Sequence, residues 1–438
     1  MSSWRSSSGL AGRRSAPPSV RPAAYRGLAP VRPGGRSAGR VRVGRAPGLG
    51  GGRRGTGRIG RVLRLLFGSG SPLRHLDWLL LAAVLALCVV GTLLVWSATA
   101  TPGATGSDPY LTKEFLNIGI GLVLMAAVSM LDYRQLRMYA PVVLGLSCLG
   151  LLAVLSPLGT VVNGAKSWID LPGGFQIEPS EYAKLSIILV SAMILAELRQ
   201  GETRPAPRSV GLMIGCCLVP LVLVLAEPDL GVVMLMVALM VGLIALSGVK
   251  LRWLAALVGG GALALTAVIK LHLLAAYQVS RLDAFLHPSA NPLGSGYSAY
   301  QSKTAIGSGG VWGDGLFHGQ LITGGYVPEA HTDFIFSVAG EDLGLAGCLL
   351  IVVLLGLVLL RAIRIAARAD DQFGMLVAVG IAIWFAVQSF INIGMTIGIM
   401  PVTGLPLPFV SYGGSALFAD MIAVGVLHTV SRHRTVFG

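Results

Sequence analysis

Residues 328–344, which read PEAHTDFIFSVAGEDLG, place charged and polar side chains directly before an apolar run that continues to Leu360. Asp333 and His331 lie at the start of this run, which is long enough to cross a membrane. A carboxylate at the entrance of a membrane helix is costly to hold, and such residues usually serve function. The stretch therefore predicts a membrane-embedded fold with a functional site at one end.

The rest of the chain has the composition of a membrane protein. Its 438 residues are 54% hydrophobic and only 12% charged, with a mean hydropathy of +0.73, too apolar for a soluble globular fold. Ten apolar segments approach the length of a membrane span, at 78–98, 115–131, 141–158, 182–198, 210–226, 230–248, 253–271, 333–360, 374–398 and 409–430. We therefore predict an all-α polytopic membrane protein with about ten transmembrane helices and a large outer loop between helices 7 and 8, at about 271–332.

The positions of Lys and Arg predict the orientation, because cytoplasmic loops carry an excess of both residues. If the N-terminus is cytoplasmic, the inner segments contain Arg134, Arg137, Arg199, Arg204, Arg208, Lys250, Arg252, Arg361, Arg364, Arg368, Arg432 and Arg434. The outer loops then hold only Lys113, Lys166, Lys270, Arg281 and Lys303. This arrangement predicts a multi-pass protein with both termini in the cytoplasm and Asp333 at the outer surface.

Residues 1–76 differ from everything that follows. They contain 16 Arg, no Lys and no acidic residue among Gly, Ser, Pro and Ala, and they account for the whole formal charge of +14. We interpret them as a disordered cytoplasmic tail that lies on anionic membrane lipid. Nucleic acid is a less favoured partner, because few aromatic side chains lie between the arginines. An organellar transit peptide is a third reading of this composition.

Polar residues gather in four further places, beginning with the loop at 271–332. Its Gly-rich stretches at 291–297, 300–310 and 313–315 would let backbone amides, with Arg281 and Lys303, hold a phosphate. The alternative is an amphipathic lid that folds over the helices.

The five cysteines all lie in apolar runs and no zinc spacing occurs, so the sequence identifies no metal site.

A second polar group precedes and opens the fourth apolar segment. Trp168 lies in its first part, and Pro179-Ser180-Glu181 is typical of a helix start. Glu181 and Lys184 would share one helix face, where they either pair with each other or line a cavity.

The third and fourth groups are rich in proline. Glu227-Pro228-Asp229 interrupts two apolar runs, so backbone groups there need partners within protein. Residues 400–415, MPVTGLPLPFVSYGGS, contain three prolines that preclude a continuous helix, and they predict an outer loop that dips into the protein. All four groups converge on the outer half of one bundle.

Taken together, these motifs resemble the SEDS proteins (shape, elongation, division and sporulation) across about 77–434. The matching stretches are 163–168, 178–184, 227–231, 291–297, 331–334 and 406–415. The sequence at 300–310 is closer to the elongation type, RodA, whereas the sequence at 403–409 is closer to the division type, FtsW. On balance the resemblance is closer to RodA. The resemblance implies a ten-helix membrane domain that polymerises lipid II into glycan strands.

The resemblance also implies roles for individual residues. Asp333 would be the general base on the acceptor sugar's 4-hydroxyl, and Arg281, Lys303 and Lys184 would hold the pyrophosphate. Trp168 and Glu181 match pocket positions of the family, and we expect Asp229, His331 and Ser415 to contact substrate as well. A divalent cation, Mg or Mn, would bridge the leaving group, and no organic cofactor is expected. The implied partner is a class B penicillin-binding protein, and the implied location is the bacterial plasma membrane.

One position departs from the family pattern, because Asn291 stands where an aspartate is common. We interpret this residue as a turn cap, a role that Asn and Asp share. Two alternatives stay open at this point. One is a transporter (flippase) of lipid-linked precursors, which would need charges along the whole path across the membrane. The other is an inactive scaffold that recruits a transpeptidase.

Overall fold

The computed structural model describes residues 77–100, 109–162, 165–172, 175–197, 205–270, 279, 285 and 296–437. These residues belong to one unit of the chain, Gly57–Gly438. Three sequence predictions lie outside them: the disorder of residues 1–76, the role of Arg281 and the turn at Asn291.

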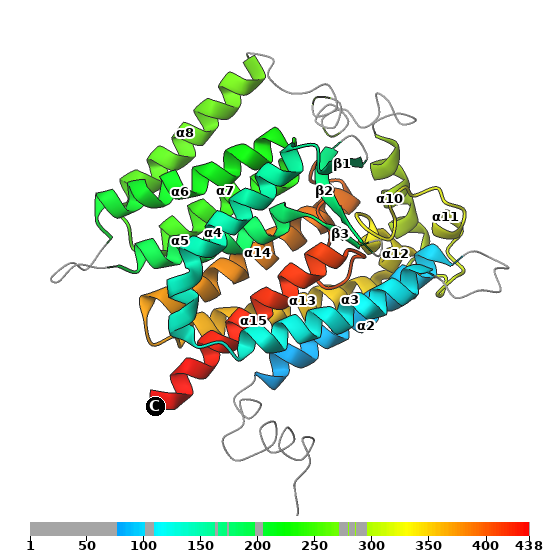
Figure 1. Cartoon of the computed structure of the whole chain (residues 1–438). Coiled ribbons are helices and arrows are strands. Elements are labelled where there is room, and N and C mark those ends of the chain that lie inside the picture. Colours follow the sequence, from blue (N-terminus) through cyan, green and yellow to red (C-terminus); the bar gives the residue numbers. More distant parts are fainter. Residues whose placement is uncertain are drawn as a thin grey trace, which may run out of the picture. The chain divides into compact units, whose positions relative to one another are not determined.

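Helices make up most of the described chain (Figure 1). They are α2 (Trp78–Thr99), α3 (Pro109–Ser129), α4 (Tyr133–Leu155), α5 (Pro179–Leu195), α6 (Pro207–Ala226), α7 (Leu230–Leu246), α8 (Leu251–Lys270), α10 (Tyr297–Ser308), α11 (Gln320–Thr323), α12 (Ile335–Asp342), α13 (Gly344–Ala367), α14 (Gln372–Ile397) and α15 (Gly414–Phe437). Seven of the described helices are long and apolar enough to cross a membrane. The prediction of a multi-pass helical membrane protein is confirmed, while its count of ten crossings stays a prediction.

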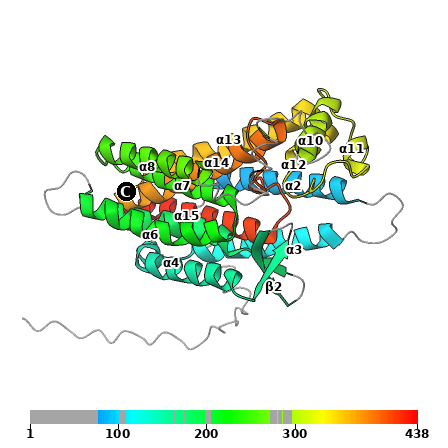
Figure 2. The same ribbon diagram turned by 90° about the horizontal axis from the view of Figure 1, so that it is seen from above.

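The protein contains a small sheet that the all-helical prediction missed. Strands β1 (Gly159–Val162), β2 (Ala165–Leu171) and β3 (Phe175–Ile177) pair antiparallel in the order β1-β2-β3. Thr160, Val161 and Ile169 supply the β-branched residues that favour strands. Figure 2 shows β2 and α10–α12 at the same end of the helix bundle.

The predicted span at 333–360 is broken into two helices. The short α12 ends at Asp342, and α13 begins at Gly344, whose φ of +65° requires glycine. A Cβ on Gly344 would lie 2.4 Å from the amide nitrogen of Gly313, because the loop after α10 crosses here. This loop also accepts the N–H groups of Leu345 and Ala346 with its carbonyls at 3.0 and 3.1 Å. The single-helix prediction was wrong because a distant loop supplies the partners that let the helix stop.

Two helices, α5 and α14, form the centre of the bundle. Nearly every residue of α5 is buried, and α14 buries large side chains such as Phe373, Trp384 and Phe385. Both helices pack against each other and against α7, whereas α8 packs on α7 with its outer face exposed. Polar side chains on α5 and α14 therefore face protein and must find partners there.

Candidate functional site

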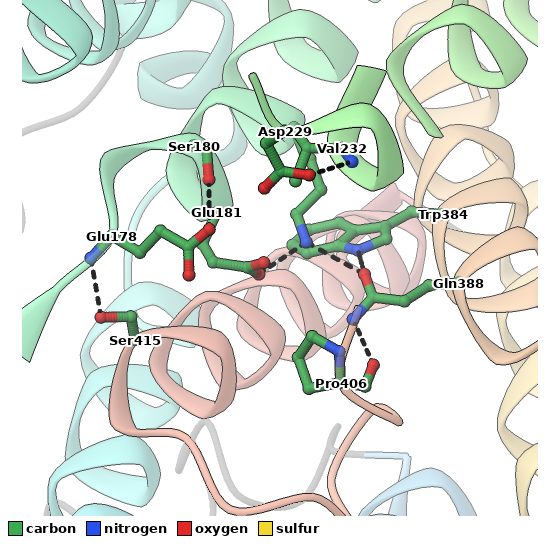
Figure 3. A network of polar contacts seen from close by, with 10 residues as sticks. Glu178, Ser180, Glu181, Asp229, Val232, Trp384, Gln388, Pro406 and Ser415 are labelled. Carbon is green, nitrogen blue, oxygen red and sulfur yellow. Dashed lines mark hydrogen bonds and ion pairs between the residues drawn. The ribbon is translucent and has the colours of Figure 1, made fainter. Parts of the chain in front are cut away.

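A buried ion pair lies at the start of α5. Lys184 Nζ lies 2.5 Å from Glu181 Oε2, and both side chains are almost fully buried. Gln388 of α14 accepts from the same ammonium at 3.0 Å, and its Oε1 also accepts from Trp384 Nε1 at 2.7 Å (Figure 3). The ammonium lies 4.9 Å from the centre of a Trp384 ring, a cation–π contact. Of the two roles open to Glu181 and Lys184, the structure therefore shows mutual pairing.

The start of α5 is fastened to the start of α15. The Ser415 hydroxyl accepts from the Glu178 main-chain N–H at 3.0 Å and donates to the Gln176 carbonyl at 2.9 Å (Figure 3). The Glu178 carboxylate in turn accepts from the Ser180 hydroxyl at 2.7 Å. Burial raises the pKa of Glu178 well above its usual range, and the nearby charges of Glu181 and Asp229 add to this effect. Ser415 thus acts as a structural link in the described geometry.

The Pro-broken junction between α6 and α7 adds two acidic side chains. Asp229 caps α7 by accepting from the Val232 N–H at 3.0 Å, and Pro228 has a φ of +28°. Burial raises the pKa of Asp229, against the lowering effect of that backbone bond. Glu227 is buried, and neither of its carboxylate oxygens has a hydrogen-bond partner among the described residues. Burial raises its pKa to about 8, with Asp229 contributing. The junction is therefore rich in acid and poor in counter-charge.

Asp333 lies half-buried in a turn before α12. The carbonyl of Glu329, which has a φ of +51°, accepts the N–H groups of Thr332, Asp333 and Phe334 at 3.1 to 3.3 Å. The Asp333 carboxylate lies beside Gly404, since a Cβ there would be 3.4 Å from Oδ2. This places the carboxylate against the Pro-rich segment that connects α14 and α15.

The Pro-rich segment enters the protein, as its sequence predicts. Leu405, Leu407, Phe409 and Val410 are all buried although the segment has no helix before α15. On α2, a Cβ at Gly91 would lie 2.5 Å from the Val410 carbonyl oxygen, so only glycine permits this approach. The segment thus forms part of the wall around Asp333.

Asn392 of α14 holds the Asp333 turn and the Pro-rich segment together. Its Nδ2 donates to the carbonyl of Asp333 at 2.9 Å and to that of Leu405 at 2.7 Å. One turn earlier, Gln388 Nε2 donates to the Pro406 carbonyl at 2.9 Å. One turn later, the Thr396 carbonyl accepts from Ser302 of α10. A single face of α14 therefore connects the buried ion pair to Asp333.

This face was not predicted from the sequence, although a signal was present. Trp384, Gln388, Asn392 and Thr396 recur every four residues within an apolar helix, and all four are buried. That spacing places them on one side of a helix. Polar residues repeated in this way within a membrane helix indicate a lined interior rather than a lipid-facing surface.

An aromatic cluster lies beside the Asp333 turn. The rings of His331, Tyr110 and Tyr412 have centroids 5.1 to 5.6 Å apart. The Tyr412 N–H also donates to the His331 carbonyl at 3.0 Å, a second link between the turn and the Pro-rich segment. His331 is therefore placed at the same end as Asp333.

Two other predicted residues are placed less centrally. Lys303 is exposed on α10 and extends to the C-terminal end of α14, where a Cβ on Gly398 would lie 2.2 Å from its Nζ. Trp168 is half-buried on β2 opposite Thr160, and the main-chain carbonyl of Trp168 accepts from the Thr160 hydroxyl. Neither side chain shares a described hydrogen bond with the ion pair.

The Gly-rich loop after α10 uses its amides within the protein. The N–H groups of Asp314 and Gly315 donate to the carbonyls of Glu341 and Asp342 at 2.9 and 3.0 Å. The Glu341 carboxylate accepts from Leu321 and Ile322 at the start of α11, at 2.7 and 3.0 Å. The amides of Asp314 and Gly315 are therefore not available to a phosphate, so this part of the phosphate prediction was wrong, while the rest of it stays a prediction.

No metal-ligand set gathers in the described part of the chain. There, no group of three or more His, Cys, Asp or Glu side chains has the arrangement that would hold an ion. The acids near Lys184 instead bond to serine, lysine and backbone groups. We therefore derive no step through a protein-held metal, and a cation held by the substrate's own phosphates stays a prediction.

A family model described as "Cell cycle protein" (FtsW/RodA/SpoVE) matches residues 77–436. The chain is 37% identical over 364 residues to peptidoglycan glycosyltransferase MrdB of Escherichia coli (strain K12), covering 82% of this chain and 94% of the relative. It is equally identical to stage V sporulation protein E of Bacillus subtilis (strain 168), covering 82% and 97%.

Two solved structures are similar to the fold. A chain from a peptidoglycan synthase complex, reported as coordinating polymerization and crosslinking, has a TM-score of 0.68 and 30% identity, covering 82% of this chain and 98% of the other. The rod shape determining protein RodA of Thermus thermophilus has a TM-score of 0.61 and 29% identity, covering 82% and 97%.

Proposed function

Because the chain belongs to the FtsW/RodA/SpoVE family and is a peptidoglycan glycosyltransferase, we propose that it polymerises lipid II with Asp333 as the general base. The observation that carries this proposal is the pair of hydrogen bonds from Asn392 Nδ2 to the main-chain carbonyls of Asp333 and Leu405. It fixes a half-buried carboxylate between two loops at the end of the bundle where the other polar motifs gather.

The chemistry assigned to Asp333 is proton transfer. Its carboxylate takes the proton of the acceptor sugar's 4-hydroxyl as that oxygen attacks the anomeric carbon of the donor. A new glycosidic bond forms, and the bond from the anomeric carbon to the pyrophosphate oxygen breaks. Undecaprenyl pyrophosphate leaves with the electron pair, so its negative charge grows in the transition state and needs cations nearby.

Lys303 and Arg281 are the proposed contacts of that pyrophosphate. Lys303 is exposed and lies one residue after Ser302, which bonds to α14. Lys184 is buried and its ammonium contacts Glu181, Gln388 and Trp384, so direct contact with phosphate would break those interactions. We therefore propose that Lys184 supports the site through α14, while Trp168, Glu181, Asp229, His331 and Ser415 shape the cavity.

The partner and the location complete the proposal. A structural neighbour belongs to a peptidoglycan synthase complex that joins polymerization to crosslinking. This supports a class B penicillin-binding protein as the partner. The apolar helices support a membrane location, which we propose is the bacterial plasma membrane, and the distribution of Lys and Arg supports cytoplasmic termini. A relative named probable peptidoglycan glycosyltransferase FtsW is 36% identical, against 37% for MrdB and for stage V sporulation protein E, so the comparisons favour neither RodA nor FtsW.

The test is polymerisation of labelled lipid II by the purified chain with its transpeptidase partner. We expect Asp333→Asn to lower the rate by about 10²- to 10⁴-fold, as for loss of a general base. The matched control is Asp170→Asn, an exposed carboxylate on β2 whose described hydrogen bond is from Gln176. Size-exclusion chromatography would verify that both variants fold. Undiminished synthesis by Asp333→Asn would refute the assignment of the base.

A further inference from the structure

A small pocket of about 30 Å³ lies at the opposite end of α2 from the proposed active site. It is lined by Asp77 at the start of α2, by Arg361, Arg364, Ile365 and Arg368 on the last turns of α13, and by Val430 and Ser431 of α15. The far end of α2 carries Ser97, which bonds Asp342 next to α13's start. The pocket therefore lies about 30 Å away from Ser97 and Asp342, because α2 is 22 residues long.

The pocket is strongly cationic. Arg361 Nε donates to Asp77 Oδ2 at 2.9 Å, and a second nitrogen of the same guanidinium also bonds this oxygen. The other Asp77 oxygen caps α2 by accepting from the Leu80 N–H. Arg364 and Arg368 have no acidic partner within ion-pair distance among the described residues. One carboxylate thus faces three guanidinium groups, which leaves an excess of positive charge in a concave site.

The surface beside the pocket is apolar. Trp78, which follows Asp77, is 60% exposed, and Leu360 and Ile363 on α13 are exposed as well. Exposed tryptophan at a helix end is typical of the level where a membrane meets water. An occupant that carries an anionic group and an apolar chain would match both the pocket and its surroundings.

The N-terminal tail does not match this pocket. Residues 1–76 contain 16 Arg and no acidic residue, so they carry the same sign of charge as the pocket. Topology alone accounts for arginine at this end of a helix. The topology rule does not explain why the arginines line a concave site, in which Asp77 pairs with Arg361 while Arg364 and Arg368 have no acidic partner among the described residues.

We propose that this pocket binds the phosphate of an anionic phospholipid headgroup. The planar guanidinium groups of Arg364 and Arg368 would each present paired N–H donors to phosphate oxygens. Arg361 would keep its bond to Asp77 and add charge from a fixed position. The acyl chains would lie on the exposed apolar face of α13 next to Leu360 and Ile363.

The experiment compares lipid retention by native mass spectrometry. The full chain, purified in neutral detergent, is mixed with phosphatidylglycerol or with phosphatidylcholine. We expect wild type to retain phosphatidylglycerol preferentially and Arg364→Gln/Arg368→Gln to retain about 30-fold less, since the variant removes two arginines that each contribute roughly 1 kcal/mol near an anionic lipid. The control, Arg134→Gln/Arg137→Gln, removes two exposed arginines from α4 outside the pocket and should behave as wild type.

Three results would overturn the proposal. They are equal retention by the pocket variant and wild type, an equal loss in the α4 control, and displacement of the lipid by an equal concentration of inorganic phosphate. The last result would indicate a site for free anions. If the glutamine variant does not fold, Arg364→Lys/Arg368→Lys keeps the charge and removes the planar donors. We expect an intermediate loss from it, and no loss would also overturn the site.

Discussion

The two ends of the bundle hold their charges in opposite ways. At the Asp333 end, the buried Glu181 and the half-buried Glu178 and Asp229 lie around the buried cation Lys184. At the Asp77 end, three arginines surround one carboxylate near the surface. The first end is acid-rich and enclosed, while the second is cation-rich and open.

This difference shows what an ion pair does in each setting. The Lys184–Glu181 pair is 0% and 1% exposed, whereas Arg361 and Asp77 are 23% and 5% exposed. The attraction within a buried pair offsets the cost of desolvation only while both partners are present, so removal of one partner leaves an unpaired buried charge. A pair near water loses little when it is broken, because solvent replaces the partner. Removal of one charged partner should therefore destabilise the acid-rich end strongly and the cation-rich end only slightly.

The largest effect should come from Lys184→Met, which leaves Glu181 buried without its cation. We expect a loss of about 3–5 kcal/mol in the free energy of unfolding, measured by SDS titration of the purified protein. Glu181→Gln combined with Lys184→Met removes both charges and should recover most of that loss. A single variant that costs less than about 1 kcal/mol would show that water reaches the pair.

Asn392→Leu should have the next largest effect. It leaves the buried carbonyls of Asp333 and Leu405 without their donor, at a cost of about 2–3 kcal/mol. We also expect kcat to fall more than KM rises, because the turn that carries Asp333 would lose its position. Ser389→Ala is the control, since this buried hydroxyl on the same helix has no described partner. Equal kinetic losses in both variants would refute the positioning role.

Arg361→Gln tests the opposite end and should cost only about 1 kcal/mol. Asp77 would keep its bond to the Leu80 N–H, and Arg364 and Arg368, which line the same pocket, would still offset its charge. Arg364→Gln, which breaks no described ion pair, should leave the unfolding midpoint unchanged. A loss for Arg361→Gln as large as that for Lys184→Met would contradict the comparison between the two ends.

The acid-rich end should also show a pH dependence. Burial raises the pKa of Glu227 from 4.5 to about 8, so the folded state binds this proton more tightly than the unfolded state. Stability should therefore fall as pH rises from about 5 to 8, where the buried carboxyl must ionise. Unfolding midpoints across this range should slope less in Glu227→Gln than in wild type. Identical slopes would show that another group titrates.

Sequence reasoning succeeded where a short pattern sets the structure. The helix start at Pro179 and the buried Pro-rich segment both follow from residues close together in the chain. The same kind of pattern placed Glu181 and Lys184 on one face but left open whether they pair, as the structure shows, or line a cavity. It failed where the partner is distant, as at Gly344, where α13 begins against a loop 31 residues earlier. The partners of Asn392 could not be predicted from the sequence either, because its hydrogen bond to Asp333 joins residues 59 positions apart.

The bond between Asn392 and Asp333 also sets an order of assembly during synthesis. The Asp333 turn leaves the ribosome before α14 has been made, so its main chain first lacks the donor that later fixes it. Ser415, made later still, closes the start of α5 by bonding Gln176 and Glu178. The Asp333 end is therefore completed by α14 and α15, the last two described helices, and a nascent chain that stops before α14 holds every earlier motif without an assembled site.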